Sequence, residues 1–563
     1  MNIDTGDGTC GAMEKTRKPP QGCAFAHTKN SRMQYREPVP LEASLKDRID
    51  MYVQPTNGVS TEGPFEFVMD PVRETVLPMD LLSLYVRGEV VDAGGERLDP
   101  ASEVCCSNFL LNSMWKTIEC RVNGKGVNLS ASHNAAYKAI MQAYLTVDGA
   151  SAWNLLPSLY TPESSSRSSS TLVASSETST STRRELLNLG GGDFEMKGPI
   201  GTVDMLMADN YLAPFNQLSL TFVRNTDEFI FNTPKVVPPP AGAAAAAPAV
   251  VVQTQVDKLE EARERLAELK AESVTLGTVP ADGSAVSTAA RAEEEGGSAA
   301  GRADRQARIA KLEAEVKALE KVVADNGPAA AAAATAAAAA EQPKQLRPRL
   351  VIKDIGLTAH RIEMTPSALV ENFRPDDVQR YLTGYGEVHS YALVTGISRK
   401  SIQVYASGVL PKQIVVGMVR TSAFVGNYHA NPFDFQSFGL NRIALKVNGV
   451  RTPQEPLEPD FEKGHIQREF VHMLMNTGKW RTEVGNSITP LNFAGGVTLF
   501  PFDLTPDSCG SFHLHAGKEG VTEVELSWAE PLDEQVTVLI FTCKDQVVTL
   551  DPKGKGEPAA HLF

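Results

Sequence analysis

The same short pattern occurs once in each half of this sequence, and it restricts the fold more than any other feature. In residues 118–122, Ile, Cys and Val alternate with Glu and Arg and run into Asn123-Gly124. In residues 443–447, Ile, Leu and Val alternate with Ala and Lys and run into Asn448-Gly449. Alternation with period two predicts a strand with one buried face, and Asn-Gly favours a tight hairpin turn. The sequence therefore predicts a similar β-hairpin in both halves.

A second match follows each hairpin in the same order. In residues 218–222, Leu, Leu and Phe occupy every second position, and an apolar triplet follows at 229–231. In residues 524–528, Val, Leu and Trp occupy every second position, and an apolar run follows at 538–541. The two hairpins lie 325 positions apart (447 minus 122). Removing a foreign segment of about 110 residues leaves roughly 215, a suitable length for one all-β domain. Short strands separated by Gly, Pro and Asn are typical of sandwiches and jelly rolls, so we predict two tandem, related β-domains.

The foreign segment covers residues 238–346 and differs sharply in composition from the rest of the chain. It contains no Phe, Trp, Tyr, His or Cys, and it begins and ends with Pro and Ala runs typical of linkers. Two stretches inside it repeat apolar residues at helical spacing: Leu259, Ala262, Leu266 and Leu269, then Ile309, Leu312, Val316, Leu319 and Val323. Each stretch predicts an amphipathic helix of two or three heptads. The pattern is compatible with a helical hairpin and with an oligomeric bundle.

These features define the domain boundaries that we expect. Residues 1–39 form an N-terminal arm, and residues 554–563 form a C-terminal tail. The first jelly roll covers 40–375, interrupted by the helical segment and by a Ser/Thr tract at 164–182 that cannot bury apolar area and predicts a mobile surface loop. The second jelly roll covers 376–553. All of the chain outside the two inserts is expected to form strands.

Composition excludes several other classes of protein. Hydrophobic residues make up 42% of the 563 and charged residues 22%, as in soluble globular proteins, and we expect no membrane span and no signal peptide. Seven cysteines without C-x-x-C spacing predict free thiols in a reducing compartment, the cytoplasm or nucleus. A formal net charge of -14 argues against specific nucleic-acid binding, because that depends on Lys and Arg contacts with phosphate.

A search for catalytic and metal-binding motifs predicts no site residues. The sequence contains no P-loop, no G-x-S-x-G and no H-E-x-x-H, and Gly190-Gly191-Gly192 is better explained as a loop. His513 and His515 would share a face if they lay in a strand, but no third metal ligand is indicated. Asp376-Asp377 is one of many acidic pairs in an acidic chain. We therefore expect no catalytic residues, no metal and no cofactor.

Several phrases resemble the hexon-like major capsid proteins of adintoviruses and related Polinton (Maverick) elements. In the second half these are residues 410–417, 431–441 followed by 443–449 and 456–461, and 498–507. The first half is similar more loosely, at residues 63–67, 108–113, 122–125 and 183–186. The resemblance spans about residues 40–235 and 347–553, whereas the two inserts depart from the family pattern.

The resemblance implies a double jelly roll and a structural, non-enzymatic role in an icosahedral virion. In this family a strand and a short helix close the first barrel, and residues 350–355 and 370–373 look like that strand and helix. The helical segment would then interrupt the first barrel near its last strands. Expected partners are other copies of the chain in a homotrimer and capsomer lattice, with penton and minor capsid proteins. Two alternatives remain: a double jelly-roll carbohydrate-active hydrolase, and a host-domesticated element protein with a binding role.

Overall fold

The computed structural model describes two compact units, Met1–Pro234 with Leu346–Phe563, and Lys235–Gln345. The residues described are 44–60, 63–98, 104–127, 134–163, 178–188, 193–201, 203–208, 210–233, 346–373, 378–482, 485–506, 515–550 and 559–562 of the first unit, and helical turns at 263, 265–267, 270, 308–311, 313–314 and 316–317 of the second.

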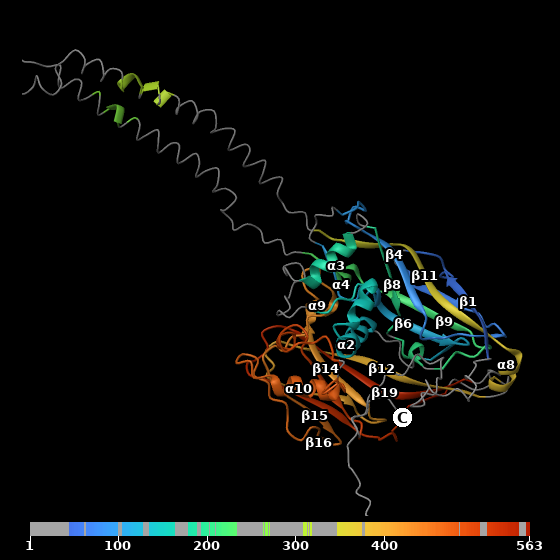
Figure 1. Ribbon diagram of the computed structural model, residues 1–563. Helices are drawn as coiled ribbons and strands as arrows, with labels where there is room; N and C mark the ends of the chain where they lie inside the picture. The colour runs from blue at the N-terminus through green and yellow to red at the C-terminus, as the bar shows by residue number, and fades with distance from the viewer. Residues whose placement is uncertain are drawn as a thin grey trace, which may run out of the picture. The chain divides into compact units, whose positions relative to one another are not determined.

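The first half of the larger unit forms two facing antiparallel sheets. One has the strand order β1-β11-β4-β8 and the other β2-β9-β6-β7, and Figure 1 shows β1, β11, β4 and β8 side by side. Their bounds are β1 Leu45–Val53, β2 Phe65–Met69, β4 Ser83–Val91, β6 Trp115–Val122, β7 Lys125–Gly126, β8 Asp193–Pro199, β9 Leu218–Arg224 and β11 Arg349–Met364.

The second half repeats this arrangement. Its sheets have the orders β12-β19-β14-β17 and β13-β18-β15-β16. Their bounds are β12 Gln379–Leu393, β13 Arg399–Tyr405, β14 Gln413–Arg420, β15 Leu440–Val447, β16 Val450–Arg451, β17 Leu499–Asp503, β18 Thr522–Trp528 and β19 Val536–Leu550. Lettered B to I in chain order, the eight strands of each half form the sheets B-I-D-G and C-H-E-F. That order is the jelly-roll path, so the predicted all-β double jelly roll is confirmed.

Short strands and helices lie in the connections between these strands. The short strands are β3 Thr75–Val76, which pairs with β11, β5 Cys105–Cys106, which pairs with β10 Phe231–Asn232, and β20 Ala559–Leu562, which pairs with β19. The helices are α1 Leu110–Ser113, α2 Ala135–Thr146, η2 Ser151–Ser158, α3 Thr178–Asn188, η3 Asp204–Met207, α4 Asp227–Ile230, α8 Pro366–Asn372, α9 Thr421–Val425, α10 Gln467–Asn476 and α11 Pro490–Ala494.

Both predicted hairpins are present. β6 turns into β7 through Asn123 (φ 53°) and Gly124 (φ 78°), and β15 turns into β16 through Asn448 (φ 52°) and Gly449 (φ 80°). Two successive residues with positive φ are the signature of the type I′ turn, which suits the twist of the flanking strands. The strand and helix predicted to close the first barrel are also confirmed, as β11 and α8.

One predicted correspondence between the halves is wrong. The match of residues 218–222 with 524–528 is correct, since these are the equivalent strands β9 and β18. Residues 229–231, however, form the end of α4 and the start of β10, and the strand equivalent to β19 is β11. The apolar triplet was mistaken for a strand because the true counterpart lies beyond the long insert.

Helices are found in two places where the sequence predicted a loop or only strands. Residues 178–182 of the Ser/Thr tract belong to α3, because the next turn of that helix buries Arg183 and Leu187 in the barrel; residues 164–177 lie outside the described residues. The expectation that the remaining chain forms only strands fails at α2 and α10. α2 consists mostly of Ala, Met, Leu, Lys and Gln, which are strong helix formers.

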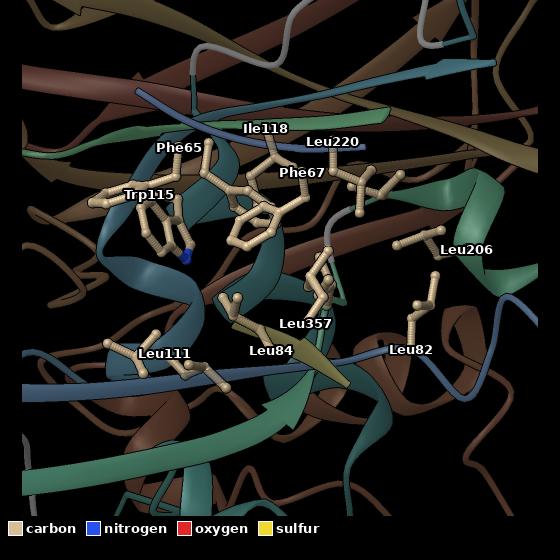
Figure 2. Packing of buried hydrophobic residues seen from close by; sticks show 14 of the residues in the cluster. Phe65, Phe67, Leu82, Leu84, Leu111, Trp115, Ile118, Leu206, Leu220 and Leu357 are labelled. Atoms are coloured by element: carbon tan, nitrogen blue, oxygen red, sulfur yellow. The ribbon is translucent and has the colours of Figure 1, made fainter. Parts of the chain in front are cut away.

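The core of the first barrel lies between its two sheets. Figure 2 shows Phe65, Phe67, Ile118 and Leu220 from one sheet facing Leu84 and Leu357 from the other. Trp115 is fully buried and makes edge contacts with Phe65, with ring centroids 5.9 Å apart. The apolar residues of these strands alternate along the chain, so one face of each sheet supplies the core.

The smaller unit is helical at the residues described. Leu266, Ile309 and Val316 lie on helical turns, and Leu259, Ala262, Leu269, Leu312, Leu319 and Val323 lie outside the described residues. Lys270 Nζ lies 2.6 Å from Glu313 Oε1, which joins the two predicted helical stretches. Among the described helices of the whole chain, none has the length and apolar character required to span a bilayer.

Candidate functional site

The candidate site is the interface between the two barrels, and α2 is its central element. This helix belongs to the first barrel by sequence, between β7 and β8, yet it packs into the core of the second. Only Gln142 and Thr146 of its residues are not buried. A helix that is apolar on all sides must be covered on all sides, so α2 is held between the barrels.

Aromatic rings from both barrels surround α2. The ring of Tyr137 lies 5.7 Å from Phe229 of the first barrel, and 5.6 Å and 5.4 Å from Phe424 and Phe433 of the second. The Tyr137 hydroxyl donates a hydrogen bond of 3.1 Å to the Pro432 carbonyl. The contacts with Phe229 and Phe433 are edge-to-face and the contact with Phe424 is stacked, and both arrangements add to the hydrophobic effect of burial. The buried hydroxyl also has its partner.

The second barrel also contributes to the core of the first. Tyr381 at the start of β12, and Val548 and Leu550 at the end of β19, belong to the hydrophobic core of the first barrel. Each barrel therefore lacks part of its core without the other. We call this arrangement reciprocal packing, and it joins the two barrels in one compact unit.

Hydrogen bonds follow the free edge of β12 where it meets the first barrel. The groups that bond it come from residues 200–217, the connection between β8 and β9. Four bonds are formed: Asn216 Nδ2 to Gln379 Oε1 (2.7 Å), Ala213 N to Tyr381 Oη (3.1 Å), Thr383 Oγ1 to Asp204 O (2.7 Å) and Gly386 N to Asp204 Oδ2 (2.8 Å). Three of these bonds use side chains of β12 and one uses its backbone N–H, so the connection packs along this edge of the strand without forming a strand ladder.

A buried ion pair lies at the same place. Lys138 Nζ of α2 is 2.6 Å from Asp204 Oδ2, and the two side chains are 2% and 14% exposed. Asp204 also accepts the Gly386 N–H, so the lysine and the β12 backbone share one carboxylate. A Cβ on Gly386 would lie 2.9 Å from Lys138 Cε, closer than carbon atoms approach. Glycine is therefore required where Lys138 crosses β12.

A second buried charged group lies in the first barrel beside the interface. Arg183 of α3 is fully buried, donates from Nη1 to Thr161 Oγ1 (2.5 Å) and lies 3.9 Å from Glu163 Oε1. Glu163 Oε1 also accepts from Asn108 Nδ2 and Tyr144 Oη, each at 3.2 Å. Asn492 Nδ2 of the second barrel donates to the Glu163 carbonyl. Arg183 thus fixes α3 and the end of the Ser/Thr tract to the barrel interface.

Asp434 is a buried carboxyl at the barrel interface. It lies between Phe433 and Phe435, is 5% exposed, and accepts a 2.6 Å hydrogen bond at Oδ2 from Gln436 Nε2. Its Oδ1 has no partner among the described residues. Burial raises the pKa of Asp434 to about 7, with Glu163 and Glu534 adding to the shift and Arg420 and Gln436 opposing it. The carboxyl therefore gains and loses its proton near neutral pH.

The described part of the chain contains no group of three or more His, Cys, Asp or Glu side chains placed to hold a metal ion. His515 is half-buried and lies outside any strand, and His513, Gly190–192 and Asp376-Asp377 lie outside the described residues. Cys105, Cys106, Cys120 and Cys543 are free thiols, as predicted for these four. Burial raises the pKa of Cys120 to about 12 and that of Cys543 to about 11, so both stay protonated at neutral pH.

Sequence reasoning did not identify Tyr137, Lys138, Asp204 or Gly386 as interface residues. The available signal was the composition of α2, an apolar helix with a single lysine in a chain that otherwise alternates. Lys138 and Asp204 come from separate connections, and the topology alone brings them to β12. The phrase 431–441, singled out by its resemblance, does lie at the interface through Phe433 and Phe435.

Comparison with known proteins gives distant similarities. No family model matches the chain. An uncharacterized protein of Caenorhabditis elegans is 28% identical over 145 residues, which are 25% of this chain and 35% of that protein, so the match spans about a third of the relative's length.

Among solved structures, the chain is similar to the Sputnik virophage structure (TM-score 0.49, 10% identity, 95% of this chain and 92% of that chain). It is also similar to the mavirus major capsid protein, with a TM-score of 0.46 and 10% identity over 99% of this chain and 96% of that chain. The Faustovirus major capsid protein gives a TM-score of 0.45 and 8% identity over 93% of each chain.

Proposed function

We propose that this chain is a hexon-like major capsid protein that assembles as a trimer into the icosahedral shell of a double-stranded DNA virus or virus-like element. The observation that carries the proposal is the reciprocal packing of two jelly rolls with the same strand order. A chain that must tile a shell needs both barrels in one fixed relation, and the barrel interface provides it.

Symmetry gives the physical reason for a trimer. Three copies of a rigid two-barrel chain place six similar barrels around a threefold axis, which approximates a hexagonal tile. Hexagonal tiles cover the flat faces of an icosahedron. In this proposal the partners are other copies of the chain in the capsomer lattice, together with penton and minor capsid proteins, and the location is the virion.

The finer assignment, to adintoviruses and Polinton elements, is supported by where the similar phrases lie. Residues 410–417 lead into and form most of β14, residues 498–507 contain β17, and residues 431–441 carry Phe433 and Phe435 at the barrel interface. The resemblance therefore concentrates in parts that build the second barrel and its contact with the first, rather than in surface loops.

We further propose that residues 238–346 form a peripheral tower. The insert begins after β10 and ends before β11, between the last strands of the first barrel. A loop at the end of a barrel accepts such an insertion at little entropic cost. The arm 1–39 lies outside the barrels in this proposal. The expected tail 554–563 is corrected, because its residues 559–562 form β20, which pairs with β19 and extends a sheet of the second barrel.

The proposal is tested by measuring the mass of the purified protein by size exclusion with light scattering, followed by electron microscopy. We expect a mass three times that of the chain and hexagonal capsomers in projection. A monodisperse monomer at micromolar concentration and physiological salt contradicts the proposal.

The hydrolase alternative requires convergent carboxylates with raised pKa values in a cleft. Among the described residues, Asp434 is the carboxyl whose pKa is clearly raised, and it is buried between the barrels, away from solvent and substrate. We therefore propose that the chain is not an enzyme. Screening glycan and peptide substrates tests this, since turnover abolished by one carboxylate substitution would contradict it. A domesticated protein with a binding role would share the fold and form no shells.

A further inference from the structure

The two barrels have equivalent edge strands, and the described part of the chain covers one of these edges and not the other. β1 stands at the edge of the order β1-β11-β4-β8, and β12 stands at the same position in β12-β19-β14-β17. An edge strand presents a row of unpaired N–H and C=O groups that can pair with another segment. Both edge strands therefore have backbone groups that another segment could cover.

Within the chain, the edge of β12 is covered by the first barrel. Its residues from Gln379 to Gly386 form hydrogen bonds with the connection 200–217, which joins β8 to β9. Asn134, just before α2, continues this line with a bond from Nδ2 to the Val388 carbonyl. The cover is thus supplied mainly by the connection between strands G and H of the preceding barrel, with Asn134 from the connection between strands F and G.

The edge of β1 has no such cover in the described part of the chain. β1 pairs with β11 on one side, and six of its nine residues are exposed, namely Lys46, Asp47, Arg48, Ile49, Asp50 and Tyr52. Ile49 and Tyr52 are 44% and 48% exposed.

The equivalent element of the second barrel is the connection between its strands G and H, which joins β17 to β18. Its backbone bonds to its own barrel at Lys518 and Gly520, through Leu410 N and Gly408 O, whereas residues 516–519 and 521 are exposed. It carries Lys518 and Glu519, while β1 carries Asp47 and Asp50 next to Arg48. Charges of both signs on each side allow opposite charges to face one another across an antiparallel or parallel contact.

We infer that β1 of one copy is covered by residues 515–521 of a second copy, in the way that residues 200–217 cover β12 within the chain. The occupant is a second copy because only another copy brings the same connection to the same strand. Such a contact is heterologous, joining different surfaces of the two copies, and its repetition closes a ring when the rotation allows. The inference rests on the proposed self-assembly and specifies its contact.

Hydrogen exchange on the unmodified protein provides the first test. The peptide covering β1, residues 45–53, should exchange at least about tenfold more slowly in the oligomer than in protein diluted to monomer. The matched control is the peptide covering β13, residues 399–405, which is also an edge strand with exposed Arg399 and Lys400 and should exchange equally in both states.

Cysteine cross-linking provides the second test and identifies the partner segment. The double variant Asp47→Cys, Lys518→Cys should form disulfide-linked dimers and trimers under mild oxidation, visible as a ladder on a denaturing gel. The control double variant Lys400→Cys, Lys518→Cys carries the same loop cysteine and places the other on β13. It should give no ladder.

The outcomes separate this inference from the proposed function. If the protein is trimeric, but β1 exchanges equally in both states and the Asp47→Cys pair gives no ladder, the contact is wrong and the capsid proposal stands. If the protein remains monomeric at every concentration tested, both are overturned. The contact is supported if β1 exchanges more slowly in the oligomer and if the Asp47→Cys, Lys518→Cys variant gives a ladder while the Lys400→Cys, Lys518→Cys control does not.

Discussion

Gly386 lies where α2 crosses β12, and its lack of a side chain makes the Lys138–Asp204 pair possible. A Cβ at this position would lie 2.9 Å from both Lys138 Cε and Phe541 Cε2. Gly386→Ala should therefore lower the free energy of unfolding by about 1 to 3 kcal/mol, the usual cost of overpacking. The control is Gly384→Ala on the same strand, where the nearest atom would be 3.9 Å away. Urea denaturation of both variants measures the difference, and equal stability would contradict the assigned crowding.

Asp434 gives a pH dependence with a defined sign. Its folded pKa of about 7 lies above the ordinary value of 3.8, so between these values the folded state binds the proton more tightly than the unfolded state. Its contribution to stability is complete below pH 3.8 and is lost as pH rises through 7. Asp434→Asn should remove about 2 to 3 kcal/mol of the difference in unfolding free energy between pH 5 and pH 8.

The measurement must compare the variant with the parent protein, because other groups titrate in the same range. His472 is the clearest, since burial lowers its pKa to about 4 and its contribution falls as the pH drops below 6.5. Thermal unfolding across pH 5 to 8 isolates Asp434 as the difference between the two curves. Parallel curves for the parent and Asp434→Asn would show that this carboxyl does not titrate as described.

At the scale of elements, α2 stabilises both barrels at once. Tyr137→Ala removes a buried ring that contacts Phe229, Phe424 and Phe433, and should cost about 3 to 5 kcal/mol. Trp153→Ala, in η2 shortly after α2, removes a still larger ring system that is 70% exposed and should change stability by less than about 0.5 kcal/mol. Chemical denaturation compares the two. A similar loss in both would mean that α2 does not join the barrels.

The elements differ in how far the sequence predicts them. The hairpins at Asn123-Gly124 and Asn448-Gly449 are local, because alternation and turn residues specify them without reference to the rest of the chain. β11 and α8 were found through a resemblance to a family. α2 was missed because its apolar residues pack against strands of the other barrel. The sequence around a helix does not show that distant elements will bury it on all sides.

At the scale of the whole molecule, the insert should be removable. Thr233 N donates to the Tyr428 carbonyl (2.6 Å), and Tyr428 Oη donates to the Pro348 carbonyl (3.4 Å), so a single residue of the second barrel contacts the chain on both sides of the insert. Replacing residues 238–346 by a short Gly/Ser linker should leave the thermal unfolding of the barrels nearly unchanged and the trimer largely intact. Calorimetry and light scattering of the shortened chain measure both. Insoluble or monomeric protein would place the insert in the structural core.

The two-barrel architecture followed from repetition in the sequence, but the barrel interface did not. Periodicity reports which face of a strand is buried and says nothing about which other element buries it. Lys138, Asp204 and Gly386 belong to three separate segments, and Tyr381, Val548 and Leu550 complete a core assembled mainly from the other half of the chain. Such contacts depend on the path of the whole chain.

The reciprocal packing also constrains how the protein can be made on the ribosome. Multidomain chains usually fold domain by domain, with the N-terminal domain completed first during synthesis. Here β11, which lies between β1 and β4, is translated only after the long insert, and Val548 and Leu550 lie at the end of β19, the last of the eight barrel strands of the second half. The core of the first jelly roll is therefore complete only once the second has been synthesised. Both barrels should reach their native state together, in one late step.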